Sequence, residues 1–222
     1  MANTETKFHD FTFTKPVIMA HPHLDAPKAI VKGGKEKYSA TFVVPQNHAD
    51  FERLKTLVLG AASEKFPGQD IMTTIKNWPW RSGTVEADKR KAKMEAAGKA
   101  YDGSGEFQRG HLLLVGRSDN PPVLAGFENG KMVEYPEQLR QKLAREKFFF
   151  GAEVYASLTI VSGGGSDGIL PYVTAYLNHV LATGAGTRMG GGRPAATDVF
   201  KGYVGHVTNV DPTTSTGGMP PL

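Results

Sequence analysis

The chain contains no cysteine, and this absence excludes several classes of site at once. Without thiols there is no disulfide, no thiolate-bound zinc, no iron–sulfur cluster and no cysteine nucleophile. No hydrophobic run reaches the roughly 20 residues that a membrane-spanning helix needs, so we expect no membrane partner. The first seven residues contain no apolar core, so we expect no secretory signal.

The 222 residues are enough for one domain with a substantial core, or for two domains at most. Residues that interrupt regular elements are frequent, with 26 glycines and 14 prolines. This composition favours short strands with irregular connections over a helical bundle. The formal net charge of +4 suits a polyanionic partner without requiring one.

Apolar patterning predicts strands at 8–19, 38–44, 110–117, 123–127, 148–161 and 169–181. The spacing of Phe51, Leu54 and Val58 predicts one well-defined helix, and 136–147 predicts a shorter one. Two prolines predict a loop at 21–27, and the charged run 86–95 fits either a helix or a loop. The sum is a small, mostly antiparallel barrel or curled sheet. We expect one domain over 1–210, with insertions at about 81–107 and 135–147, and a disordered tail at 211–222.

The first candidate binding element is a basic, glycine-centred turn that leads directly into a strand. Gly33 and Gly34 can adopt the positive φ angles of a tight turn at little steric cost. Lysines crowd this turn and an aromatic residue starts the strand: Lys28, Lys32, Lys35, Lys37 and Tyr38. Such a turn is typical of a groove for single-stranded nucleic acid, and also of many ordinary hairpins.

A second basic and aromatic cluster centres on Trp78-Pro79-Trp80. Pro79 disfavours helix at Trp78, and alternate residues of an extended segment share a face, so both indoles can point together. Cations and further aromatic side chains accompany them: Lys76, Arg81, Lys89, Arg90, Lys91, Lys93, Tyr101, Phe107, Arg109 and Arg117. Cations neutralise phosphates, and unpaired bases stack on flat apolar faces. The alternative is a solvated charged face with indole rings that cap the core.

Other motifs give little evidence for chemistry. His21, His23 and Asp25 alternate along one segment, which fits either ligands that converge on a metal ion or a polar loop. The glycine runs at 163–165 and 190–192 lack the following Lys-Ser or Lys-Thr of a phosphate-binding loop. No serine lies in a nucleophile elbow and no close acidic pair is evident. We therefore expect no catalytic residue, no cofactor and no metal.

Four segments in succession resemble one known family. They are Pro27-Lys28-Ala29 followed by 33–45; Trp80-Arg81-Ser82-Gly83; 149–160, joined by a glycine hairpin to Asn178-His179-Val180; and 190–193 running to 197–200. In order and spacing, the chain resembles single-stranded-DNA-binding proteins of tailed bacteriophages, relatives of the phage helix-destabilising proteins. The resemblance covers most of residues 28–200.

This resemblance implies a mainly β, OB-fold-like, antiparallel five-stranded barrel that coats single-stranded DNA during phage replication or recombination, without enzymatic activity. It implies the cytoplasm of the bacterial host as the location. Single-stranded DNA is the implied partner, phage or host replication and recombination proteins are further candidates, and a homo-oligomer stays open. The binding weight falls on residues 28–38 and on the loops around Trp80 and Arg109.

Two features depart from the family pattern. The helix at 136–147 has the character of an insertion, and the tail carries one acid, Asp211, where such proteins often end in an acidic segment. A structural phage protein of the tail or capsid is the main alternative function. A metal-dependent nuclease that uses His21, His23 and Asp25 is a third.

Overall fold

The computed structural model describes residues 6–29, 33–103, 105–166 and 168–189. All of these belong to the first of two compact units, which spans Met1–Gly190. Lys32, the glycine run at 190–192 and the expected tail at 211–222 lie outside the described residues. Within the described ranges, no helix is long and apolar enough to cross a membrane.

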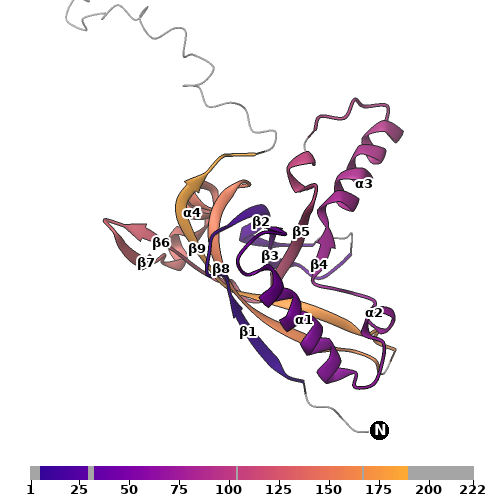
Figure 1. The fold of residues 1–222 in the computed structure, drawn as a ribbon. Coiled ribbons are helices and arrows are strands. Elements are labelled where there is room, and N and C mark those ends of the chain that lie inside the picture. The colour runs from indigo at the N-terminus through magenta and orange to yellow at the C-terminus, as the bar shows by residue number, and fades with distance from the viewer. Residues whose placement is uncertain (1–5, 30–32, 104, 167, 190–222) are drawn as a thin grey trace, which may run out of the picture. The chain divides into compact units, whose positions relative to one another are not determined.

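Strands dominate the described part of the chain, and helices connect several of them (Figure 1). The strands are β1 (Phe8–Thr12), β2 (Val17–Lys28), β3 (Lys37–Pro45), β4 (Trp80–Ser82), β5 (His111–Ser118), β6 (Val123–Glu128), β7 (Lys131–Glu134), β8 (Ala152–Gly163) and β9 (Tyr172–Gly186). The α-helices are α1 (Phe51–Lys65), α2 (Ile71–Thr74), α3 (Gly83–Ala96) and α4 (Arg140–Lys147). Two 3-10 helices complete the set, η1 (Glu106–Gln108) and η2 (Glu137–Leu139).

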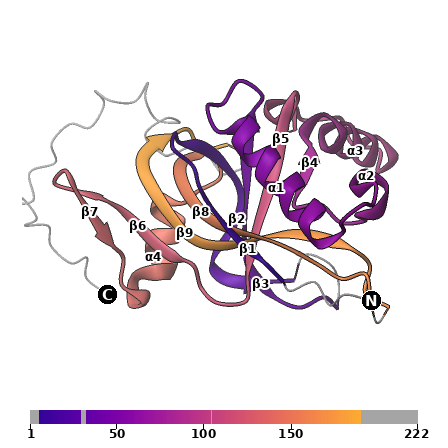
Figure 2. The same ribbon diagram turned by 60° about the horizontal axis from the view of Figure 1, so that its bottom comes forward.

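The strands form one mixed sheet whose central part closes on itself. β8 pairs with β2, β2 with β3, β3 with β5, β5 with β9, and β9 pairs again with β8. β1 adds to β8, and the β6–β7 hairpin adds to β9. Figures 1 and 2 both show this hairpin on the side of the sheet away from α3.

Three expectations are corrected by this arrangement. The sheet is not purely antiparallel, because β5 and β6 each run parallel to β9. Four further strands, β1, β4, β6 and β7, join the five of the ring, and the described ranges contain four α-helices where one well-defined helix and one shorter helix were expected. Short elements such as β4 and α2 carry little periodicity, and strand pairing depends on contacts between distant segments, so neither is visible in local patterns. Segment 21–27 belongs to β2 rather than to a loop, although its register with β3 shifts twice around the prolines.

Inward-pointing side chains of the ring form the main core, with Met19, Phe42, Leu114, Leu158 and Leu177 almost fully buried. The predicted apolar stripe of α1 packs against this core through buried positions, Leu54, Val58 and Ala61. A smaller cluster lies on the opposite face of β2, β3 and β5 and consists of Ala20, Val43 and Leu113, covered by Ile18, Phe107 and Phe150. The sheet is therefore apolar on its inner face and only partly covered on its outer face.

Asp50 connects the start of α1 to the link between β1 and β2. Its carboxylate is 3% exposed and accepts hydrogen bonds from the Thr14 amide at 2.7 Å, the Thr14 hydroxyl at 2.9 Å and the Arg53 guanidinium at 2.8 Å. Burial alone would raise its pKa, but the hydrogen bonds from Arg53 and Thr14 outweigh it and hold the pKa of Asp50 below the ordinary value near 3.8.

The lowered pKa of Asp50 predicts how acid affects stability. A carboxylate whose pKa is depressed by folding stabilises the protein above its unfolded pKa, and this contribution is lost as pH falls through the folded pKa. We expect Asp50→Asn to lower the free energy of unfolding by about 1–3 kcal/mol at pH 7, and the difference to shrink below about pH 4. Urea denaturation at several pH values measures this, with exposed Glu52→Gln as the control. An equal loss at all pH values would contradict it.

The expected helix at 136–147 is present as η2 followed by α4, and it packs against β2. Arg140 is 7% exposed and reaches three different segments. Its guanidinium donates to the carbonyls of Leu24 at 3.2 Å and Pro122 at 2.7 Å, and it forms an ion pair with Glu137. The helix therefore fastens β2 to the connection between β5 and β6.

Candidate functional site

The site begins where two neighbouring strands diverge. β5 and β9 pair only at Gly116–Ala175 and Arg117–Tyr176. Beyond that point the segment 77–82 lies between them: β4 pairs with β5, and Asn77 forms an isolated bridge with Tyr172. Backbone hydrogen bonds tie this segment to both sides, from the Val115 amide to the Pro79 carbonyl at 2.7 Å and from the Val173 amide to the Asn77 carbonyl at 2.8 Å. Trp78-Pro79-Trp80 is thus fixed between β5 and β9.

α3 continues directly from this segment and forms a wall beside it. Ser82 caps the helix by accepting a hydrogen bond from the Val85 amide at 3.4 Å. Gly83 is buried, and a Cβ atom there would collide with the backbone carbonyl oxygen of Gln108. Only glycine allows the two backbones to approach so closely, which explains the glycine in Trp80-Arg81-Ser82-Gly83.

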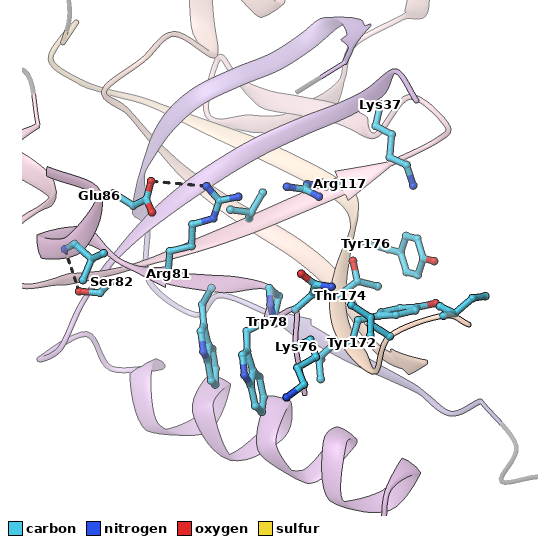
Figure 3. Close-up of a pocket in the computed structure, with 18 of the residues that line it drawn as sticks. Lys37, Lys76, Trp78, Arg81, Ser82, Glu86, Arg117, Tyr172, Thr174 and Tyr176 are labelled. Carbon is cyan, nitrogen blue, oxygen red and sulfur yellow. Dashed lines mark hydrogen bonds and ion pairs between the residues drawn. The ribbon is translucent and has the colours of Figure 1, made fainter. Parts of the chain in front are cut away.

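An open groove of about 1050 Å³ runs along these elements (Figure 3). Among the described residues, one carboxylate lines it, Glu86, together with five basic side chains: Lys37, Lys76, Arg81, Lys89 and Arg117. Four aromatic side chains line it as well, namely Trp78, Trp80, Tyr172 and Tyr176. The groove therefore combines an excess of positive charge with aromatic surface.

Strand alternation decides which side chains enter the groove. Lys37, Arg117 and Tyr176 point to the outer face of β3, β5 and β9, because opposite residues of paired strands share a face. Tyr38, the next residue after Lys37, points to the other face, where the Arg140 guanidinium lies over its ring at 5.7 Å. Tyr38 therefore lies outside the groove.

The two tryptophans point together, as the sequence predicted. Their ring centroids are 5.6 Å apart and the planes differ by 6°, so the indoles stack on each other. Both are half-buried and pack against the main core, and Figure 3 shows Trp78 on the side of the strand opposite Arg81. Each indole thus shields part of the other, and their remaining surface borders the groove.

The cations of the groove differ in how they are paired. Arg81 lies 3.8 Å from Glu86, and Lys89 lies 3.0 Å from the same carboxylate. Lys37 contacts Asp119 at 3.4 Å, and more exposed Lys35 contacts it at 2.9 Å. The hydrogen bond from Lys35 and the charge of both lysines hold the pKa of Asp119 below its usual range.

Arg117 differs from the other cations of the groove. Its Nε atom is buried and makes no hydrogen bond within the described part of the chain. Burial and the nearby charge of Arg81 both lower the pKa of Arg117. A half-buried guanidinium next to a second guanidinium is electrostatically unfavourable without a nearby anion.

The predicted site residues divide into two groups. The structure brings Lys37, Trp78, Trp80, Arg81 and Lys89 into the groove. Lys28 is exposed at the end of β2, opposite Lys37 in register, and Lys35 is exposed beside Asp119. Their role in binding stays a prediction, as does that of Tyr38.

The remaining predicted residues belong to α3 and the chain that follows it. Arg90 and Lys91 are exposed on α3 and do not line the groove. The Tyr101 hydroxyl accepts a hydrogen bond from the Gly105 amide at 3.1 Å, and Phe107 contacts Phe150 edge-to-face. Arg109 forms ion pairs of 2.8 Å with both Glu106 and Asp88, and these carboxylates raise its pKa. Tyr101, Phe107 and Arg109 are thus engaged in holding the chain between α3 and β5.

Tyr172 and Tyr176 were not among the predicted site residues. Both lie on β9 in the segment expected as strand 169–181, and both face the groove. A signal was available, because Tyr172, Thr174 and Tyr176 are polar or amphipathic residues that alternate with apolar Val173, Ala175 and Leu177 in the first half of the strand.

The candidate metal ligands do not form a site. No group of three histidine or acidic side chains that could hold a metal ion occurs among the described residues. The His21 ring stacks on Phe150 with centroids 5.0 Å apart, and burial together with Arg90 lowers its pKa. Asp25 contacts Arg145 instead, at 3.7 Å.

Comparison with known proteins identifies the fold. No protein-family profile matches the sequence, and no curated protein matches it significantly. The single-stranded DNA-binding protein of bacteriophage Enc34 in complex with single-stranded DNA is similar in structure, with a TM-score of 0.59 and 18% identity over 82% of this chain and 89% of that chain. The same Enc34 protein without DNA gives a TM-score of 0.57 at 18% identity, over 86% and 89% of the two chains. At this identity the likeness concerns the fold: the chain has the fold of the Enc34 single-stranded DNA-binding protein.

Proposed function

We propose that this protein is a non-catalytic single-stranded DNA-binding protein that coats the strand with little sequence preference. The proposal depends on the groove. Its described lining contains five cations and four aromatic residues, and a single carboxylate. Cations neutralise phosphates and aromatic rings stack on unpaired bases, and a single strand offers both groups together. Sequence tolerance follows because every base has a π-face and phosphates are the same at every step.

The fold supports this proposal. The Enc34 protein with the same fold is described in complex with single-stranded DNA. We infer that the closed ring of β2, β3, β5, β9 and β8 is an OB-like barrel and that the groove crosses its outer face. By the same reasoning, the protein serves phage DNA replication or recombination in the cytoplasm of the bacterial host. Replication and recombination proteins are then candidate partners, and self-association on DNA is open to test.

Intrinsic fluorescence provides a direct test, because both tryptophans of the chain line the groove. We expect oligo-dT to change the tryptophan emission at low salt, and the affinity to fall as salt rises. If each of the five lining cations neutralises one phosphate, the slope of log K against log salt should be about −3.5, and if fewer do so the slope should be shallower.

A duplex of equal length serves as the comparison, since its bases are already stacked and paired. Unchanged emission together with no retention of labelled oligo-dT at low salt would refute the proposal. Assembly into large particles without nucleic acid would instead support the structural phage protein that the sequence left as an alternative.

A further inference from the structure

Arg117 and Arg81 direct two positive charges into the same part of the groove. Figure 3 shows both guanidinium groups on the same side of the segment that carries Trp78. Arg117 comes from β5 and Arg81 from the neighbouring β4, and the charge of Arg81 acts on Arg117. The Nε atom of Arg117 is buried and lacks a hydrogen-bond partner among the described residues. This part of the groove therefore concentrates two positive charges that a bound anion would offset.

A carboxylate of the protein already occupies one side of this position. Glu86 lies in the first turn of α3, where the positive end of the helix dipole favours an anion. It contacts Arg81 at 3.8 Å and Lys89 at 3.0 Å, and it is the one acidic side chain of the described groove lining. Glu86 thus neutralises Arg81 from within the molecule.

We propose that the groove seats one phosphate of the bound strand between Arg117 and Arg81, and that this phosphate replaces Glu86 as the partner of Arg81. The inference rests on the proposed function and names the ligand group as a phosphodiester. Guanidinium groups bind phosphate oxygens through paired N–H donors, a geometry that lysine does not offer. The phosphate also places a negative charge beside half-buried Arg117, whose own charge is unfavourable next to that of Arg81.

When the phosphate replaces Glu86 at Arg81, Glu86 still has Lys89 as an ion-pair partner. Lys89 is its closer contact, so Glu86 keeps an ion pair after Arg81 turns to the phosphate. The carboxylate nevertheless repels the incoming phosphate and competes for Arg81. Glu86 therefore lowers affinity for DNA and acts as an internal competitor at this position.

The test is fluorescence anisotropy of labelled oligo-dT over a series of NaCl concentrations, with the full chain and its variants. Arg117→Ala should reduce the magnitude of the log K against log salt slope by about 0.7, the value for one phosphate on a single strand. It should also weaken binding at low salt by about tenfold. Glu86→Gln should strengthen binding by about three- to tenfold at low salt.

Controls carry the same change of charge away from the groove. Arg145→Ala removes an exposed arginine that contacts Asp25, and Glu95→Gln removes an exposed carboxylate on α3. Both should leave affinity and slope close to those of the unmodified protein. A thermal melt of each variant verifies folding. If Arg117→Ala does not fold, the affinities of Glu86→Gln and Glu95→Gln for oligo-dT are compared to test the phosphate seat.

The outcomes separate two failures. If the unmodified protein binds no oligo-dT, the proposed function is wrong. If it binds but Arg117→Ala keeps the full salt slope, or Glu86→Gln behaves like Glu95→Gln, the phosphate seat is overturned.

Discussion

Replacement of Tyr172 and Tyr176 by alanine together should weaken binding of oligo-dT by about 30-fold or more. Both rings lie at alternate outward positions of β9 and line the groove beside Arg117. Stacking of a base on an aromatic side chain contributes about 1–3 kcal/mol, so loss of two platforms costs about 2–6 kcal/mol. Titration of labelled oligo-dT by anisotropy at fixed salt measures the change.

Two controls separate stacking from packing. Tyr172→Phe with Tyr176→Phe keeps both rings and should bind within about threefold of the unmodified protein, because stacking uses the ring face. Tyr155→Ala removes a half-buried tyrosine on β8 that does not line the groove, and should bind normally. Normal affinity of the double alanine variant would show that the strand does not follow this face of β9.

Arg140→Ala should lower the free energy of unfolding by about 2–4 kcal/mol. The substitution removes the donors to the carbonyls of Leu24 and Pro122, and buried carbonyls without partners cost about 1–3 kcal/mol each. It also removes the cation above the Tyr38 ring. Urea denaturation followed by circular dichroism measures the loss.

Lys142→Ala is the matched control, since Lys142 is exposed on the same helix and carries the same charge. It should change stability by less than about 0.5 kcal/mol. The folded Arg140→Ala protein should still bind oligo-dT, because Arg140 does not line the groove. Unchanged stability of Arg140→Ala would mean that the contacts of Arg140 do not stabilise the packing of α4 against β2.

Local sequence predicted the elements that depend on local geometry. The stripe of Leu54, Val58 and Ala61 gave α1, and Pro79 between two tryptophans gave an extended segment with both indoles on one side. The composition of the site, cations with aromatic rings, was equally visible in the chain. These features follow from dihedral preferences and from the periods of helix and strand, which act within a few residues.

Charge pairing limited the prediction of the site residues. Local sequence does not distinguish Arg109 and Lys35 from the cations that line the groove. Arg109 is held by Glu106, three residues away, which sequence could have indicated, and by Asp88, which it could not. Lys37 meets Asp119 across 82 residues of chain. Which cations are held in ion pairs is therefore decided in part by segments far apart in sequence.

The sequence by itself determined a mainly β chain with basic and aromatic side chains at two places, residues 28–38 and 76–81. Tertiary structure decided that Lys37 of the first place lines the same groove as the described residues of the second. The parallel pairing of β5 with β9 brings Tyr172 and Tyr176 beside Arg117, and the divergence of these strands leaves the position that Trp78 and Trp80 fill. The reason is physical: alternation fixes the face of each side chain along its own strand, whereas the neighbouring strand is chosen by packing of the whole core.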